Sequence, residues 1–138
     1  KTTKAIRERK WFNYLLSKGK QKEKIMEEMK QVLSVLDEKG KMAYKHGDGM
    51  ESPAEAVSRL LTFLREIAVA YAGKTILVVN HGNNMRSLLT HLGWATFDEL
   101  PTGSIKNTSY IVLESDGIDF FVKKVEDIEK KKGAVRIL

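Results

Sequence analysis

The strongest chemical signal in the sequence is a histidine and a glycine at the end of an apolar stretch. Residues 75–80, Thr-Ile-Leu-Val-Val-Asn, form a short run rich in β-branched residues, which is typical of a strand buried on both faces. His81 and Gly82 interrupt this run, and apolar residues then recur at helical spacing as far as Leu92. A strand that opens into a helix in this way directs free backbone N–H groups at one crevice, which favours an anion such as phosphate.

A histidine at the mouth of such a turn can stabilise phosphoryl transfer, although its position alone fits a loop histidine satisfied by its neighbours equally well. A protonated His81 imidazole, beside the N–H groups of Gly82 and Asn83, would stabilise the charge on the oxygens of a transferring phosphoryl group. The other His-Gly pair, His46-Gly47, lies in a glycine-rich loop with no strand before it, and we interpret it as a solvated turn.

A longer pattern adds to this interpretation. Residues 78–92, together with Glu-Leu-Pro-Thr-Gly at 99–103, resemble the second-histidine region of the histidine phosphatase superfamily, and most closely that of the phosphoglycerate mutases. Arg7-Glu8-Arg9 resembles the family's acidic segment, whose glutamate is the proton donor. Glu51-Ser52 resembles its Gly-Glu-Ser helix start, with Met50 in place of the glycine.

The resemblance implies a site built from residues far apart in the sequence. It makes His81 one of two active-site histidines and Glu8 the group that protonates the leaving oxygen, although the two arginines beside Glu8 favour its charged form. Asn107, which we expect at the mouth of the next strand, is a candidate substrate-binding residue, and a turn-capping asparagine is an equally good interpretation. No carboxylate or histidine cluster has the spacing of metal ligands, so we expect no metal and no cofactor.

One family motif is missing. The nucleophile of the family is a histidine in an Arg-His-Gly motif after the first strand, and no such motif occurs in the 138 residues. We therefore expect a C-terminal portion of the family's domain that lacks its N-terminal segment and is inactive alone. The implied function is phosphoryl transfer through a phosphohistidine, as a phosphate monoester phosphatase or a phosphoglycerate mutase. The alternative is a noncatalytic truncated domain that binds a phosphorylated ligand or a protein partner.

Two amphipathic helices are expected before the histidine turn. Residues 21–38 carry one apolar stripe, and Gly40 would end this helix as a C-terminal glycine cap. A capping-box pattern, Ser-Pro-Ala-Glu, opens a second helix at residues 53–72. Arg59 lies on that helix, and an ion pair with Glu51 or simple exposure explains it better than contact with a substrate.

The strands follow these helices. We expect strands at residues 75–80, 107–114 and 118–125, the last two joined by a hairpin turn, and a helix at 83–92. This order predicts an α/β fold with a layered, mainly parallel sheet flanked by helices, and residues 75–80 at its centre. We expect one partial phosphoglycerate mutase-like domain over residues 1–138, in which the missing first strand leaves 75–80 open to strand exchange or homo-oligomerisation.

The apolar residues at the two ends of the chain recur with no clear periodicity. Near the N-terminus, Trp11, Phe12 and Tyr14 are interpreted as packing residues of a loop that crosses the sheet. The charged tail, residues 126–138, ends in a short apolar stretch that we expect to form a last strand or a docking segment.

Composition narrows the class of partner. The formal net charge is +6, but the lysines mostly alternate with glutamates, which is typical of solvated helix faces, so we expect no nucleic acid and a small phosphorylated substrate instead. The chain has no cysteine, no apolar run long enough for a membrane span and no signal-peptide pattern at its start. We therefore expect no membrane partner and a cytoplasmic location.

Overall fold

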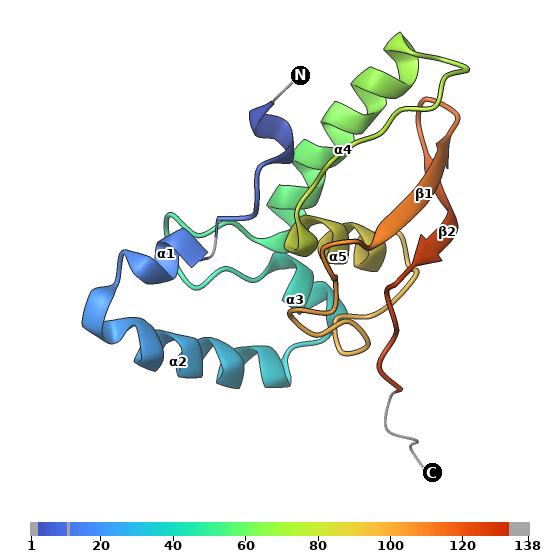
Figure 1. Cartoon of the computed structure of the whole chain (residues 1–138). Helices are drawn as coiled ribbons and strands as arrows, with labels where there is room; N and C mark the ends of the chain where they lie inside the picture. Colours follow the sequence, from blue (N-terminus) through green and yellow to red (C-terminus); the bar gives the residue numbers. More distant parts are fainter. Residues whose placement is uncertain (1–2, 11, 133–138) are drawn as a thin grey trace.

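The structure is a computed structural model that describes residues 3–10 and 12–132 (Figure 1). In chain order the elements are η1 (Lys4–Ile6), α1 (Phe12–Leu16), η2 (Gly19–Gln21), α2 (Lys22–Val35), α3 (Glu38–Ala43), α4 (Pro53–Ala70), α5 (Gly82–His91), β1 (Tyr110–Ser115) and β2 (Phe120–Glu126). No described helix has both the length and the apolar character needed to cross a membrane. Trp11 and the end of the tail, residues 133–138, lie outside the described residues, so the expectations for them stay predictions.

The longest helix, α4, forms where the capping-box pattern predicted it. The Ser52 hydroxyl accepts a hydrogen bond from the Glu55 backbone N–H (3.1 Å), and the Glu55 carboxylate accepts one from the Ser52 N–H (2.9 Å). These bonds satisfy N–H groups that a helix start otherwise leaves unpaired, and Pro53 fits the first turn because it lacks such a group. The helix ends at Ala70, two residues before the expected end.

The main core joins α4, α5 and the β1–β2 hairpin. Buried leucines of the two helices, Leu60, Leu61 and Leu88, pack together, and the inward side chains of the hairpin pack against them. Figure 1 shows the hairpin beside α4 and α5. This packing fixes the start of α5, and therefore His81, relative to α4.

The hairpin is confirmed, with a shorter first arm than expected. β1 and β2 pair antiparallel, with Tyr110 opposite Glu126 and Ser115 opposite Phe120. The first arm begins at Tyr110 rather than at residue 107, because residues 106–109 form a turn closed by two hydrogen bonds between Lys106 and Ser109, both 3.0 Å long.

The layered, mainly parallel sheet is not confirmed. Within residues 3–10 and 12–132 the sheet has two strands, β1 and β2. Residues 75–80, expected as a buried central strand, pair with no described segment, and Leu77 and Val79 are 90% and 77% exposed. A strand needs a neighbour for its backbone groups, and the described part of the chain supplies none here.

The helix expected at 21–38 is also divided. α2 ends at Val35, and Asp37 then caps α3 by accepting a hydrogen bond from the Gly40 N–H (2.7 Å). Gly40 therefore lies inside a new helix rather than capping the end of the previous one. The apolar stripe did not reveal this break, because a short side chain at Asp37 competes with the helix for the following N–H groups.

The exposed segment 75–80 leads to a prediction about association. We expect the 138-residue chain to self-associate, because an open apolar segment with unpaired backbone groups is a template for pairing. Leu77→Lys should shift the chain toward monomer, as measured by sedimentation velocity over a range of concentrations. Val35→Lys is the matched control, because Val35 is also exposed (81%) but lies at the end of α2. A monodisperse monomer for the unmodified chain at every concentration contradicts this expectation.

Candidate functional site

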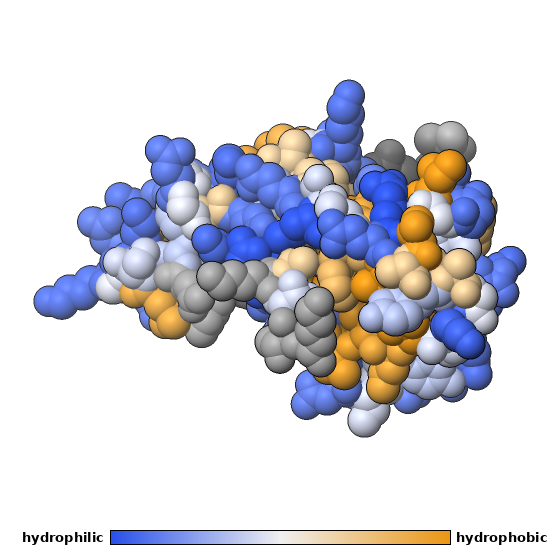
Figure 2. All heavy atoms as spheres, turned by 90° about the horizontal axis from the view of Figure 1, so that it is seen from above, coloured by the Kyte–Doolittle hydropathy of each residue, from blue (hydrophilic) through white to orange (hydrophobic). Residues whose placement is uncertain are grey.

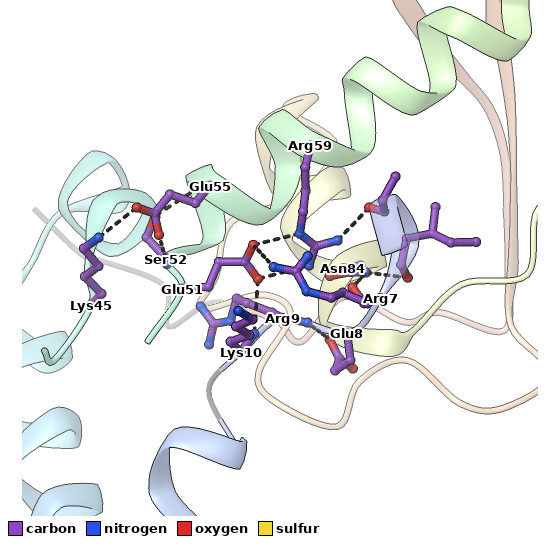
Figure 3. Close-up of polar contacts among 12 residues, drawn as sticks. Arg7, Glu8, Arg9, Lys10, Lys45, Glu51, Ser52, Glu55, Arg59 and Asn84 are labelled. Carbon is purple, nitrogen blue, oxygen red and sulfur yellow. Dashed lines mark hydrogen bonds and ion pairs between the residues drawn. The ribbon is translucent and has the colours of Figure 1, made fainter. Parts of the chain in front are cut away.

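A buried carboxylate, Glu51, organises one side of the site. It is only 8% exposed, and Arg59 binds it through two hydrogen bonds, Nε to Oε1 at 2.7 Å and Nη2 to Oε2 at 3.0 Å (Figure 3). The Arg7 guanidinium lies 3.6 Å from the same carboxylate. The ion pair expected for Arg59 is therefore confirmed, and it is a structural contact.

The same group holds the N-terminal segment in place. The Lys10 N–H donates to Glu51 Oε2 (3.1 Å), and the Glu51 N–H donates back to the Lys10 carbonyl (2.8 Å). Arg59 Nη1 also donates to the Ala5 carbonyl (2.7 Å). Both ends of the segment that carries Glu8 are therefore bound to the start of α4.

Burial and charge act on Glu51 in opposite directions. Burial is the largest single effect and disfavours the charged carboxylate. The hydrogen bonds from Arg59 and Lys10, with the charges of Arg59 and Arg7, outweigh it together and hold the pKa of Glu51 below its ordinary value of 4.5. The carboxylate is therefore ionised in the folded protein at neutral pH.

A second contact, made by Asn84, joins this segment to α5. Its side chain is buried, and its Nδ2 donates to the carbonyls of Arg7 (2.7 Å) and Ile6 (3.3 Å) and to Asn80 Oδ1 (3.0 Å). Asn80 Oδ1 in turn accepts a hydrogen bond from the His81 N–H (2.8 Å). One amide therefore holds the residue before Glu8 and the residue before His81, so the structure brings these two predicted site residues to the same end of α5.

His81 is placed as a helix cap whose side chain makes no cap bond. It has extended backbone angles (φ −106°, ψ 151°), its imidazole is exposed, and α5 begins at Gly82, one residue earlier than expected. The first N–H groups of a helix have no partner within it, so Gly82 and Asn83 present theirs beside this imidazole. Gly82 also packs closely against Ile105, where an added Cβ would lie 3.5 Å from the Ile105 Cβ.

Glu8 is half-buried, and its Oε1 accepts a hydrogen bond from the N–H of Arg9 (2.8 Å). The next side chain, Arg9, has a buried Nε with no hydrogen-bond partner among the described residues. Burial lowers the pKa of Arg9, although the charges of Glu8 and Glu51 oppose this effect. Positive charge therefore lies close to the proposed proton donor.

Sequence reasoning missed a second half-buried cation, Arg86. Burial, and then the charge of Arg9, lower the pKa of Arg86 to about 10, against the opposing charges of Glu38 and Asp98. The guanidinium donates to the carbonyl of Leu100 and lies 4.8 Å from the ring centroid of Phe97. Its position one helical turn before the buried Leu89, on the inward side of α5, is the sequence signal that could have indicated its burial.

Two other predicted positions lie elsewhere. Asn107 is exposed in the turn of residues 106–109, and no described contact joins it to Glu8 or His81. His46 was interpreted as part of a solvated turn; residues 46–49 do form a turn, but the His46 side chain is half-buried rather than solvated. Its Nδ1 lies 3.0 Å from the Tyr44 hydroxyl and its Nε2 lies 3.4 Å from a Glu28 carboxylate oxygen, so packing against α2 holds the ring.

No group of three or more histidine or acidic side chains that could hold a metal ion occurs among the described residues. The chemistry that the site offers is electrostatic and acid–base. An imidazole and helix N–H groups can hold an anion, and a carboxyl group in the segment that Asn84 joins to this helix can transfer a proton.

The buried ion pair leads to a prediction about stability. Glu51→Gln removes the charge that Arg59 and Arg7 compensate, so we expect a loss of about 3 kcal/mol in the free energy of unfolding at pH 7. Because the folded pKa of Glu51 is lowered, its stabilising contribution is present above pH 4.5 and is lost as the pH falls below that value. Urea unfolding should therefore show the wild type and the variant converging in acid.

Glu66→Gln is the control for this experiment, because Glu66 is an exposed carboxylate on the same helix. It should leave the free energy of unfolding within about 0.5 kcal/mol of the wild type. Equal effects of the two substitutions at pH 7 contradict the role given to Glu51.

Comparison with known proteins finds relatives for part of the chain. Two 2,3-bisphosphoglycerate-dependent phosphoglycerate mutases, from Mycobacterium bovis and Mycobacterium tuberculosis, are each 38% identical over 60 residues. The match covers 38% of this chain and 24% of each relative, so the chain corresponds to about a quarter of their length. No solved structure matches the chain.

A family profile covers much more of the sequence. The profile described as "Histidine phosphatase superfamily (branch 1)" matches residues 1–128, which include both Glu8 and His81. The resemblance to phosphoglycerate mutases extends over the shorter stretch shared with the mycobacterial proteins. The chain therefore belongs to the histidine phosphatase superfamily (branch 1).

Proposed function

We propose that the chain is part of a phosphoryl-transfer enzyme that acts on a phosphate monoester through a phosphohistidine. The observation that carries this proposal is the Asn84 amide, which holds the residues before Glu8 and before His81 (2.7 Å and 3.0 Å). A proton donor and a cationic stabiliser then lie at one helix start, as phosphoryl transfer requires. Membership of the histidine phosphatase superfamily supports the same reaction class.

Each site residue has a role in this reaction. Protonated His81 and the N–H groups of Gly82 and Asn83 stabilise the equatorial oxygens of the transferring group. The nucleophilic imidazole nitrogen bonds to phosphorus as the phosphorus–oxygen bond of the ester breaks, and Glu8 gives its proton to the leaving oxygen. Asn107 contributes to substrate binding from the turn before β1. The phosphoryl group then passes from the nucleophilic histidine to water in a phosphatase, or to a hydroxyl of the substrate in a mutase.

The nucleophilic imidazole comes from a segment outside these 138 residues. His46 is held by Tyr44 and Glu28, and His91 is exposed at the far end of α5 from His81, so neither is aimed at the start of that helix. The exposed residues 75–80 lead directly to His81 and offer a free edge to a strand. Pairing there would complete the layered, mainly parallel sheet and place a second imidazole beside the phosphate.

A noncatalytic function is the second candidate. The observation that favours it is that Tyr44 and Glu28 hold the His46 ring. Among the described residues, His81 is then an imidazole at the start of α5 without a second imidazole to act as the nucleophile. In that case the helix start binds a phosphorylated ligand, or a protein that carries one, without turnover. The two candidates differ in whether a covalent phosphoenzyme forms.

Activity of the intact protein tests this proposal. His81→Ala should lower turnover of phosphate monoesters about 10²–10³-fold, because it removes one preorganised charge stabiliser. His91→Ala is the matched control, since His91 is exposed on the last turn of the same helix, and it should leave turnover unchanged. Acid-labile phosphoenzyme should accumulate during turnover, and release of free phosphate or of an isomer distinguishes a phosphatase from a mutase.

Two results would overturn the assignment. Equal turnover by the wild type and His81→Ala would remove His81 from the mechanism. Binding of phosphate monoesters without turnover or phosphoenzyme, in the intact protein, would support the noncatalytic candidate instead.

A further inference from the structure

A basic pocket lies outside the segment that carries Glu8. It has a volume of about 280 Å³ and is formed by the loop before β1 and the stretch after β2. Its lining residues are Pro101, Gly103, Ser104, Lys106, Glu129, Lys130 and Lys131. Three lysines and one glutamate give this lining a net charge of +2.

The two walls of the pocket are held together by specific contacts. The Lys131 N–H donates to the Glu99 carbonyl (2.8 Å), which fastens the stretch after β2 to the turn before Pro101. The Lys130 ammonium lies 4.5 Å from the ring centroid of Trp94, so the aromatic face positions this side chain. Figure 1 shows the stretch after β2 running beside the loop that precedes β1.

The pocket's positive charge is uncompensated within the described residues. No ion pair within 4.0 Å joins Lys106, Lys130 or Lys131 to a described carboxylate. Each exposed lysine contributes little to binding alone, so a ligand must engage several of them at once. Lysine ammonium groups act as point charges and cannot bind one carboxylate through two parallel hydrogen bonds, as arginine does. Several lysines therefore suit an anion whose phosphate oxygens are spread over a larger volume.

One wall of this pocket lies outside the stretch that the family profile matches. The match to the family profile ends at residue 128, whereas Glu129, Lys130 and Lys131 lie beyond it. The other wall belongs to the matched region and adjoins Ile105, which packs on Gly82 at the start of α5. The pocket therefore lies beside the start of α5.

We propose that this pocket, between residues 101–106 and 129–131, binds a small anion with two or more phosphate groups. The inference does not depend on the proposed function, because none of the three lysines takes part in the phosphoryl transfer described above. The anion is held by Lys106, Lys130 and Lys131 together, and Glu129 opposes it. The second phosphate-bearing group of a substrate and a separate oligophosphate share this chemistry.

The experiment uses the intact protein and inorganic pyrophosphate as the probe. Calorimetry at fixed ionic strength should show pyrophosphate binding more tightly than sulfate, and Lys130→Gln with Lys131→Gln should weaken it about tenfold. Glu129→Gln should strengthen it, because the opposing charge is removed. Lys24→Gln is the control, since Lys24 is an exposed lysine on α2 in another part of the molecule (Figure 1).

Tryptophan emission locates the ligand. In a Trp11→Phe background, pyrophosphate should change the emission of Trp94, because Lys130 lies over its ring. His81→Ala should retain this signal, which separates the pocket from the start of α5. Competitive inhibition of the enzyme by pyrophosphate identifies a substrate group as the ligand, and noncompetitive inhibition or no effect on turnover identifies a separate anion.

Several results would overturn the proposal. Pyrophosphate binding no tighter than sulfate, or unchanged by loss of Lys130 and Lys131, excludes this pocket. Loss of the Trp94 signal in His81→Ala places the anion at α5 instead. Binding of an acidic peptide or an RNA oligonucleotide in the absence of pyrophosphate binding assigns the surface to a macromolecule.

Discussion

The arrangement of this chain depends on a single buried carboxylate. Glu51 lies just before α4, and its oxygens are bound by Arg59, by the Lys10 N–H and, at longer range, by Arg7. A buried carboxylate with fewer partners would be protonated or would destabilise the fold, so these contacts must form together. They hold residues 5–10, a segment with little regular structure that includes Glu8, between α4 and α5.

Two kinds of constraint then define the site. The Glu51 contacts fasten the N-terminal segment to α4, and the Asn84 amide fastens it to α5. Neither set of contacts touches the proposed chemistry, yet both decide where the proton donor lies relative to His81. The half-buried guanidinium groups of Arg9 and Arg86 add positive charge near this segment, and burial lowers the pKa of both. An anionic substrate suits such surroundings.

Local patterns in the sequence predicted local structure well. The capping box at Ser52 and the turn of the β1–β2 hairpin depend on neighbouring residues, so both were predictable. The state of residues 75–80 was not, because a strand forms only with a partner, and the apolar character of these residues favours pairing without identifying that partner. The positions of Arg9 and Arg86 were also hidden, because burial of a cation is decided by contacts between distant segments. His81 was found because its motif is contiguous, whereas Asn84, which links it to Glu8, gives no signal of its own.

In the proposed mechanism, Asn84 at the start of α5 brings Glu8 and His81 to the same phosphate. A crystal structure of the intact protein with orthovanadate, which imitates a transferring phosphoryl group, tests it most directly. We expect the His81 imidazole and the Glu8 carboxyl group both to lie within hydrogen-bond distance of the vanadate, with the Gly82 and Asn83 N–H groups directed at its oxygens. Vanadate bound by other side chains, with Glu8 still holding the Arg9 N–H, would contradict it.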